Sequence, residues 1–225
     1  MATDHIVKSY DEHITLLTRK ILEMGGLVEQ QIARAIEALV NRDVEQANLV
    51  IEQDDQIDRI EEEIDQYAIR LLATRQPMAI DLRLIAMAMK ISNDLERIGD
   101  YATNIAKRCE RLAKEQPVKP LYAIPRMAQI SQSMVKDILD AYVERDADKA
   151  IVVWHRDDEV DDMYTSLFRE LLTYMMEDPR NISPCIDLLF VAKNLERIAD
   201  HTTNIAEKIH YMIHGERINR MPSSV

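Results

Sequence analysis

The chain has 225 residues and a formal net charge of −12, with 47% hydrophobic and 30% charged residues. This balance is typical of a soluble globular protein rather than a disordered one. The negative charge argues against non-specific binding to nucleic acid or to an anionic lipid surface. Glycine, proline and aromatic residues are few, whereas strong helix formers abound, so we expect an all-α fold.

Apolar residues at helical spacing predict a long first helix over residues 9–41. Gly25 and Gly26 interrupt it, and there we expect a kink or a close helix crossing. Asp43 is suited to cap a second helix that ends near residue 75. Pro77 separates this helix from a third one over residues 78–115.

Two prolines, Pro117 and Pro120, then break the helical pattern, which predicts a linker over residues 116–124. The pattern resumes in a fourth helix over residues 125–143. A fifth is expected from the cap residue Asp146 to residue 177, and a sixth from there to residue 214, with Gly215 at its C-cap. We therefore predict a first domain (1–115), a second domain (125–215) and a C-terminal tail (216–225).

One phrase of thirteen residues occurs twice at an offset of 100 residues. The segment DLERIGDYATNIA at 94–106 returns as NLERIADHTTNIA at 194–206, with nine identical positions. A match of this length indicates two related halves. Together with the helix pattern, it predicts two tandem, pseudo-symmetric three-helix antiparallel bundles.

Each half carries two pairs of carboxylates four residues apart, so that both members of a pair lie on one helix face. Like charges at this spacing destabilise an isolated helix by a few tenths of a kcal/mol, so we expect a compensating positive charge. Helical-wheel positions place the pairs outside the apolar stripes, on the bundle surface. The predicted metal ligands are Asp54, Asp58, Glu96, Asp100, Asp157, Asp161, Glu196 and Asp200.

Clustered carboxylates without histidine or cysteine suit Mg, Mn, Ca or iron better than zinc. The structural alternative needs no metal, because Arg97 and Arg197 follow directly after two of these carboxylates and could neutralise them. Carboxylates on an exposed helix face can also simply be solvated.

Other functional signals are absent from the sequence. It contains no Gly-rich phosphate loop, no Gly-x-Ser-x-Gly and no dinucleotide fingerprint, so we predict no catalytic residue, no organic cofactor and no enzyme. Cys109 and Cys185 are not equivalent in the repeat and form no CxxC, which favours two reduced thiols. With no signal peptide and no apolar run of about 20 residues, a cytoplasmic protein is expected.

Several further segments, taken together, resemble the PhoU family of bacterial phosphate-uptake regulators. They are spread over nearly the whole chain: MGGLVEQQ at 24–31, RQP at 75–77, DLRL at 81–84, LERIGD at 95–100, LTYMMED at 172–178 and LERIAD at 195–200. The resemblance implies the same fold, two similar three-helix bundles. The second copy departs from the pattern at Ala199, where the first has Gly99.

The resemblance also implies a function. PhoU-like proteins keep the phosphate-starvation (Pho) response off when phosphate is plentiful, and they connect the importer ATPase PstB with the sensor histidine kinase PhoR. Some bind metal clusters through Glu/Asp-x-x-x-Asp pairs, and many are homodimers. Contact with the membrane would then occur only through partners.

Two other classes of function remain open on the sequence. One is a metal-dependent phosphoesterase that uses metals bound to the surface carboxylates. The other is a structural helical scaffold or a metal store.

Overall fold

The computed structural model describes residues 2–118 and 122–218, and in these ranges every regular element is a helix. The prediction of an all-α fold is confirmed. None of the described helices carries a stretch apolar enough to cross a membrane. The elements are α1 (Ala2–Asn41), α2 (Val44–Arg75), α3 (Ile80–Ala113), α4 (Ala123–Glu144), α5 (Ala147–Trp154), α6 (Asp157–Glu177), the 3₁₀ turn η1 (Pro179–Asn181) and α7 (Ile182–His214).

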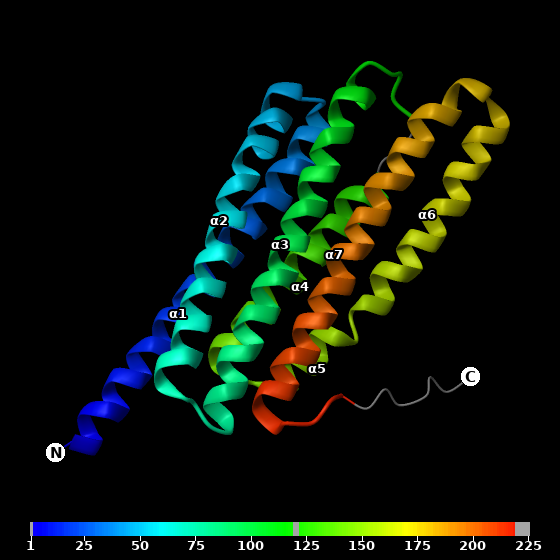
Figure 1. Cartoon of the computed structure of the whole chain (residues 1–225). Coiled ribbons are helices and arrows are strands. Elements are labelled where there is room, and N and C mark those ends of the chain that lie inside the picture. The colour runs from blue at the N-terminus through cyan, green and yellow to red at the C-terminus, as the bar shows by residue number, and fades with distance from the viewer. Residues whose placement is uncertain (1, 119–121, 219–225) are drawn as a thin grey trace.

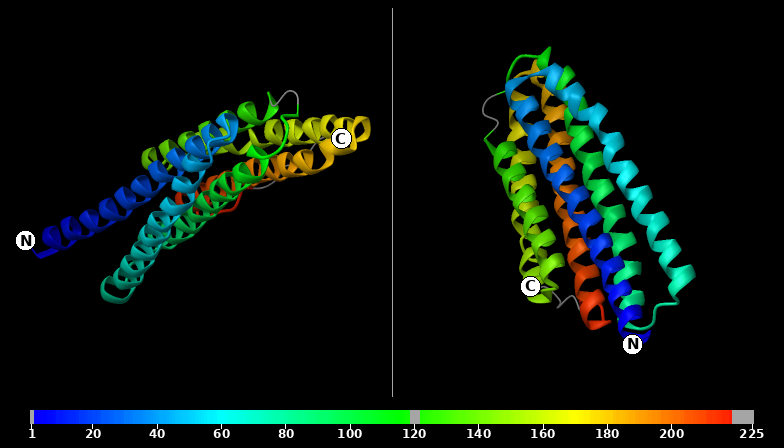
Figure 2. Two further views of the ribbon diagram at one scale, coloured as in Figure 1. Left: turned by 90° about the horizontal axis from the view of Figure 1, so that it is seen from above. Right: turned by 90° about the vertical axis from the view of Figure 1, so that its left-hand side faces the viewer.

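The helices form one elongated bundle in which α3 and α7 are central (Figure 1). α3 packs against α1 and α2 of its own half, while α7 packs against α4, α5 and α6. α3 and α7 pack against each other, and α1 also contacts α4. The long helices run along the length of the molecule in alternating directions, so that α3 and α7 are antiparallel (Figure 2). Buried apolar residues of both halves belong to one continuous core, including Ile21, Ile98, Ile138 and Ile198, each 0% exposed.

The α3–α7 contact holds two buried carboxylates, each in contact with basic side chains of the other half. Asp94 of α3 lies 3.0 Å from His201 Nδ1 and also contacts Lys208. Asp187 of α7 accepts from Arg108 Nη1 at 3.1 Å, and Arg111 Nε lies 3.3 Å from its other oxygen. Because a buried charge is costly unless it is paired, these contacts favour one register of α3 against α7.

Tyr101 and His201 occupy the same position in the two copies of the repeat, and they meet each other. Their ring centroids are 5.5 Å apart, and the Tyr101 hydroxyl lies 3.5 Å from His201 Nε2. In an antiparallel pair of related helices, a position that meets its own copy marks the local two-fold axis. The two halves are therefore related by an approximate two-fold axis that passes between these rings.

The prediction of a single helix from Asp146 to residue 177 is wrong. A tight turn at His155 and Arg156, in which Arg156 N donates to Val153 O at 3.0 Å, separates α5 from α6. In this turn the Arg156 guanidinium donates to Asp137 Oδ2 at 2.6 Å and to Ser133 Oγ at 2.5 Å, which ties the turn to α4. The second half thus has four α-helices rather than three.

Most other helix ends lie close to their predicted places. The Asp43 side chain accepts from Gln46 N at 3.0 Å, and Asp146 accepts from Lys149 N at 2.9 Å, so both predicted N-caps are confirmed. Gly215 adopts φ 76° as the C-cap of α7. The larger differences are that α1 already begins at Ala2, and that α4 begins at Ala123, inside the predicted linker.

The glycine pair of α1 marks a close helix crossing rather than a helix end. α1 continues through both residues. A Cβ on Gly25 would overlap the side chain of Leu139 on α4, whereas a Cβ on Gly26 would meet nothing within 4 Å. Gly25 therefore allows α1 of the first half to approach α4 of the second.

We expect Gly25→Ala and Gly26→Ala to shift stability in opposite directions. Gly25→Ala should lower the free energy of unfolding by about 1–3 kcal/mol, because Leu139 is buried and has to move. Gly26→Ala should raise it by up to about 1 kcal/mol, because alanine is the better helix former and has free space. Urea unfolding followed by circular dichroism measures both, and equal effects of the two changes would contradict the crossing.

Two acidic clusters as the candidate functional site

The first acidic cluster lies where α2 packs against α3 and consists of Asp54, Asp58, Glu96 and Asp100. Burial raises the pKa of Asp58, and the carboxylates of Asp54 and Asp100 raise it further. The pKa of Glu96 is also raised, first by burial and then by Asp100, with Asp58 adding to the effect. The two predicted pairs of this half are therefore brought together across the two helices, and their charges repel each other.

Polar and cationic side chains satisfy part of this cluster. Arg97 Nη1 lies 3.2 Å from Asp100 Oδ2, and Arg97 Nε lies 3.5 Å from Glu96 Oε2. Gln31 of α1 donates from Nε2 to Asp54 Oδ1 at 2.8 Å. Arg97 thus compensates part of the negative charge without a metal, as the structural alternative predicts. Gln31 was not predicted, because nothing in the sequence pattern links a residue of α1 to this site.

The second acidic cluster lies where α6 packs against α7 and consists of Asp157, Asp161, Glu196 and Asp200. Burial, followed by the charges of Asp161, Asp200 and Glu196, raises the pKa of Asp157 to about 7. Burial and the Glu196 carboxylate raise the pKa of Asp161 in the same way. The break before α6 places Asp157 in the first turn of that helix, beside α7.

Cations compensate the second cluster less than the first. Lys193 contacts one oxygen of Glu196, but Glu196 Oε2 and Asp157 Oδ1 are buried and have no hydrogen-bond partner. Arg197, the repeat copy of Arg97, instead lies over the Tyr101 ring at 5.6 Å. In the described part of the chain, Arg197 makes no ion pair with this cluster. A cation from outside would find unsatisfied oxygens here.

The prediction that these carboxylates lie on the bundle surface needs a correction. Asp58 and Asp161 are exposed, but the other six are half-buried: Asp54, Glu96, Asp100, Asp157, Glu196 and Asp200. A helical wheel shows which face of a helix points away from its own apolar stripe. It does not show that a neighbouring helix covers the flank of that face, as α2 does for α3.

The chemistry of both clusters fits a hard cation. All donors are carboxylates, which suit Mg, Mn, Ca or iron, and each cluster has at least one buried oxygen without a hydrogen-bond partner. In residues 2–118 and 122–218, no three His, Cys, Asp or Glu side chains are already arranged as a metal site. Metal binding at these eight residues therefore stays a prediction, and it requires side chains to reorient or water to complete the coordination.

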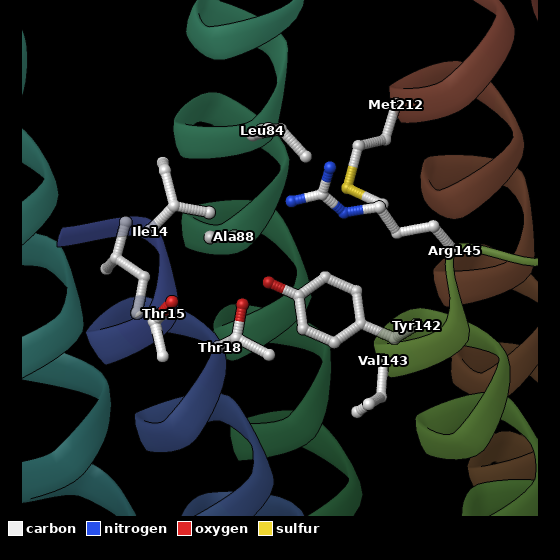
Figure 3. A pocket seen from close by; sticks show the side chains of 10 residues that line it. Ile14, Thr15, Thr18, Leu84, Ala88, Tyr142, Val143, Arg145 and Met212 are labelled. Atoms are coloured by element: carbon white, nitrogen blue, oxygen red, sulfur yellow. The ribbon is translucent and has the colours of Figure 1, made fainter. Parts of the chain in front are cut away.

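A cavity of about 200 Å³ lies elsewhere, between the two halves (Figure 3). Side chains of α1, α3, α4 and α7 line it, and most of them are apolar. The Tyr142 hydroxyl points toward Thr18 from one side, and the Arg145 guanidinium lies on another (Figure 3). None of the predicted site residues lines this cavity, and no carboxylate does. The acidic clusters are therefore separate from it.

We expect the metal-free protein to lose stability as the pH rises from about 4 to 8. The folded pKa of Asp157, about 7, lies above its ordinary value of 3.8, so the protonated form favours the fold. This contribution is complete below the ordinary value and is lost as the pH rises through 7. Thermal unfolding in a chelator should show a smaller decrease of Tm for Asp157→Asn than for the wild type. The exposed neighbour Asp162→Asn is the control, and identical pH profiles of Asp157→Asn and wild type would contradict the burial of this charge.

Comparisons with known proteins agree with the repeated architecture. The family profile of the PhoU domain matches residues 21–109 and again residues 124–209. A phosphate-specific transport system accessory protein PhoU homolog of Caulobacter vibrioides is 51% identical over 217 residues, which are 96% of this chain and 94% of that protein. The homolog of Rhizobium meliloti is 50% identical, over 96% of this chain and 91% of its own length.

Two solved structures share the fold. The crystal structure of PhoU from Pseudomonas aeruginosa has a TM-score of 0.88 and 42% identity, covering 92% of this chain and all of that one. PhoU from Streptococcus pneumoniae, a phosphate transport system regulatory protein, has a TM-score of 0.86 and 32% identity, covering 93% and 99% of the two chains. With a domain match in each half and relatives of this similarity over nearly the whole length, the chain belongs to the PhoU family.

Proposed function

We propose that this chain is a cytoplasmic accessory protein of phosphate transport that represses the phosphate-starvation two-component response when phosphate is plentiful. The observation that carries the proposal is the PhoU domain match in both halves, at 21–109 and 124–209. The relatives named phosphate-specific transport system accessory proteins support it. The proposed partners are the sensor kinase PhoR and the importer ATPase PstB, with a homodimer as the working form.

An adaptor of this kind acts by contact, and the fold provides two related surfaces for it. Each half carries its own acidic cluster, and the approximate two-fold axis between α3 and α7 relates the two clusters. A cation bound at a cluster would offset the mutual repulsion of its carboxylates, and Asp157 Oδ1 and Glu196 Oε2 are unsatisfied oxygens that could contact it. Binding of metal to one state of the bundle would then bias which partner is held.

Deletion of the gene tests the role directly. In the source bacterium, secreted phosphatase activity in phosphate-rich medium should rise by at least about tenfold without this gene, because the kinase is no longer held off. A plasmid copy of the gene should restore the low level. If the deletion strain shows no rise, the proposed repression is wrong although the fold stands.

The acidic clusters are tested by the double variant Asp100→Asn with Asp200→Asn. Removing one carboxylate from each cluster should weaken metal binding by at least about tenfold and should raise phosphatase activity in phosphate-rich medium. Metal content after dialysis is measured by mass spectrometry, and circular dichroism checks the fold. The control is Asp55→Asn with Asp158→Asn, which removes the same charge from exposed positions. Full repression by a stably folded Asp100/Asp200 variant would show that the clusters are not needed.

A further inference from the structure

Six large apolar side chains are exposed on the hairpin formed by α6 and α7. On α6, Phe168 and Leu172 are each 40% exposed and Met176 is 86% exposed. On α7, the exposed fractions of Ile182, Ile186 and Phe190 are 43%, 40% and 48%. We call these six residues the apolar patch. A concentration of large apolar side chains on a water-facing surface is a common mark of an interaction site.

The six side chains form paired rows rather than scattered positions. On each helix they are spaced by four residues, so each row follows one helix face. Lys193 of α7 lies 5.4 Å from the ring centroid of Tyr164 on α6, which sets the antiparallel register. In this register Phe168 lies beside Phe190, and the later residues of α6 lie beside the earlier residues of α7. α6 forms the edge of the molecule opposite α2, with α7 beside it (Figure 1). The guanidinium of Arg108 on α3 lies 4.4 Å from the ring centroid of Phe190 and borders the patch on the α7 side.

The repeat does not require this patch. The equivalent positions in the first half are Asp65, Ile69, Ala73, Leu82, Ala86 and Lys90. Two of these six first-half residues are large and apolar, whereas all six of their counterparts in the second half are. Core packing, which both halves share, therefore does not explain the patch. The first-half hairpin also exposes large apolar side chains, namely Ile69, Met78, Ile80 and Leu82, but only Ile69 and Leu82 lie at positions equivalent to the patch. The two paired rows of three are therefore a feature of the second half.

The patch continues into the second acidic cluster along the same side of the hairpin. At about 100° per residue, Phe168 and Leu172 lie within about 20° of Asp161 on α6, and Ile182 lies in line with Asp200 on α7. Phe168 is seven residues from Asp161, which is about 10 Å along the helix. The surface is thus apolar at the hairpin end and acidic two turns further on. In the described residues, Lys193 is the cation that pairs with this cluster.

We propose that this surface binds an amphipathic helix of a partner protein when the second acidic cluster holds no metal, with the apolar stripe of the helix on the patch and its lysine or arginine side chains on the carboxylates of that cluster. Helix-in-groove recognition has this form, with apolar anchors at helical spacing and charges that fix the direction. A second copy of this chain is a poorer occupant, because its net charge is −12 and its own patch adjoins the same carboxylates. The inference rests on the proposed adaptor function and assigns it a surface.

A synthetic peptide tests the chemistry of this site. The probe is a fluorescent 20-residue amphipathic helix with a leucine stripe and four lysines at one end. A matched peptide has glutamates in place of the lysines. Fluorescence anisotropy should show that the wild-type protein binds the lysine peptide and binds the glutamate peptide at least about tenfold more weakly. Failure of the wild type to bind the lysine peptide, or equal affinity for both peptides, would overturn the proposal.

Variants locate the binding surface. Leu172→Ser with Phe190→Ser should weaken binding of the lysine peptide by at least about tenfold. Met176→Ser, at a side chain too exposed to matter for folding, should weaken it by about threefold. The matched control is Ile69→Ser with Leu82→Ser at the equivalent positions of the first half, which should bind as the wild type does. Unchanged affinity of both patch variants would overturn the proposal. So would a patch variant that turns a dimer into a monomer in sedimentation velocity without changing peptide affinity, because the patch would then bind a second copy.

Phosphatase activity separates this inference from the proposed function. If the wild-type gene represses phosphatase and the Leu172/Phe190 variant represses equally well, the surface assignment is wrong and the regulatory role stands. If the wild-type gene does not repress, the regulatory role is wrong, and peptide binding alone decides the surface.

Discussion

The antiparallel contact between α3 and α7 determines the arrangement of everything else in this protein. Asp94 and Asp187 are buried there, and each finds its cations on the opposite half. Separating or sliding the halves would leave a carboxylate inside the protein without its partner, which is far more costly than losing a surface ion pair. α3 carries two carboxylates of the first acidic cluster, and α7 carries two of the second. The contact between these helices therefore fixes where the two clusters lie relative to each other.

The two clusters share a sequence pattern but differ in their electrostatics. In the first, Arg97 lies against both Glu96 and Asp100, and Gln31 donates to Asp54. In the second, Arg197 is turned toward Tyr101, and the break in the helix ahead of α6 leaves Asp157 half-buried among like charges. The two clusters therefore have equivalent carboxylates, but the negative charge of the second is less compensated by neighbouring cations than that of the first.

Much of this structure could be predicted from local signals in the sequence, and the rest depends on contacts between helices. Caps such as Asp43 and the repeated phrase are local signals, so most of the helices and the repeat that the family profile matches twice could be predicted. The break at His155 was missed because neither glycine nor proline marks it, and the contact of Arg156 with α4 joins residues that are far apart in the sequence. The burial of Glu96 and the role of Gln31 arise from neighbouring helices. The apolar patch was also missed, because Phe168 and Leu172 lie next to the core stripe of α6 and have the spacing of core residues.

The meeting of Tyr101 with His201 shows what joining two related bundles in one polypeptide makes possible. If the halves were separate identical chains, the side chain on the symmetry axis would face its own duplicate, and two tyrosines or two imidazoles would compete for the same role. Covalent fusion removes that restriction. One copy can supply a hydroxyl and the other an imidazole, whose Nε2 lies near that hydroxyl while its Nδ1 contacts Asp94. Asp94 likewise has a neutral counterpart, Asn194, that identical subunits would forbid. In one polypeptide the two halves can therefore differ in sequence both at the axis and at the acidic clusters further from it.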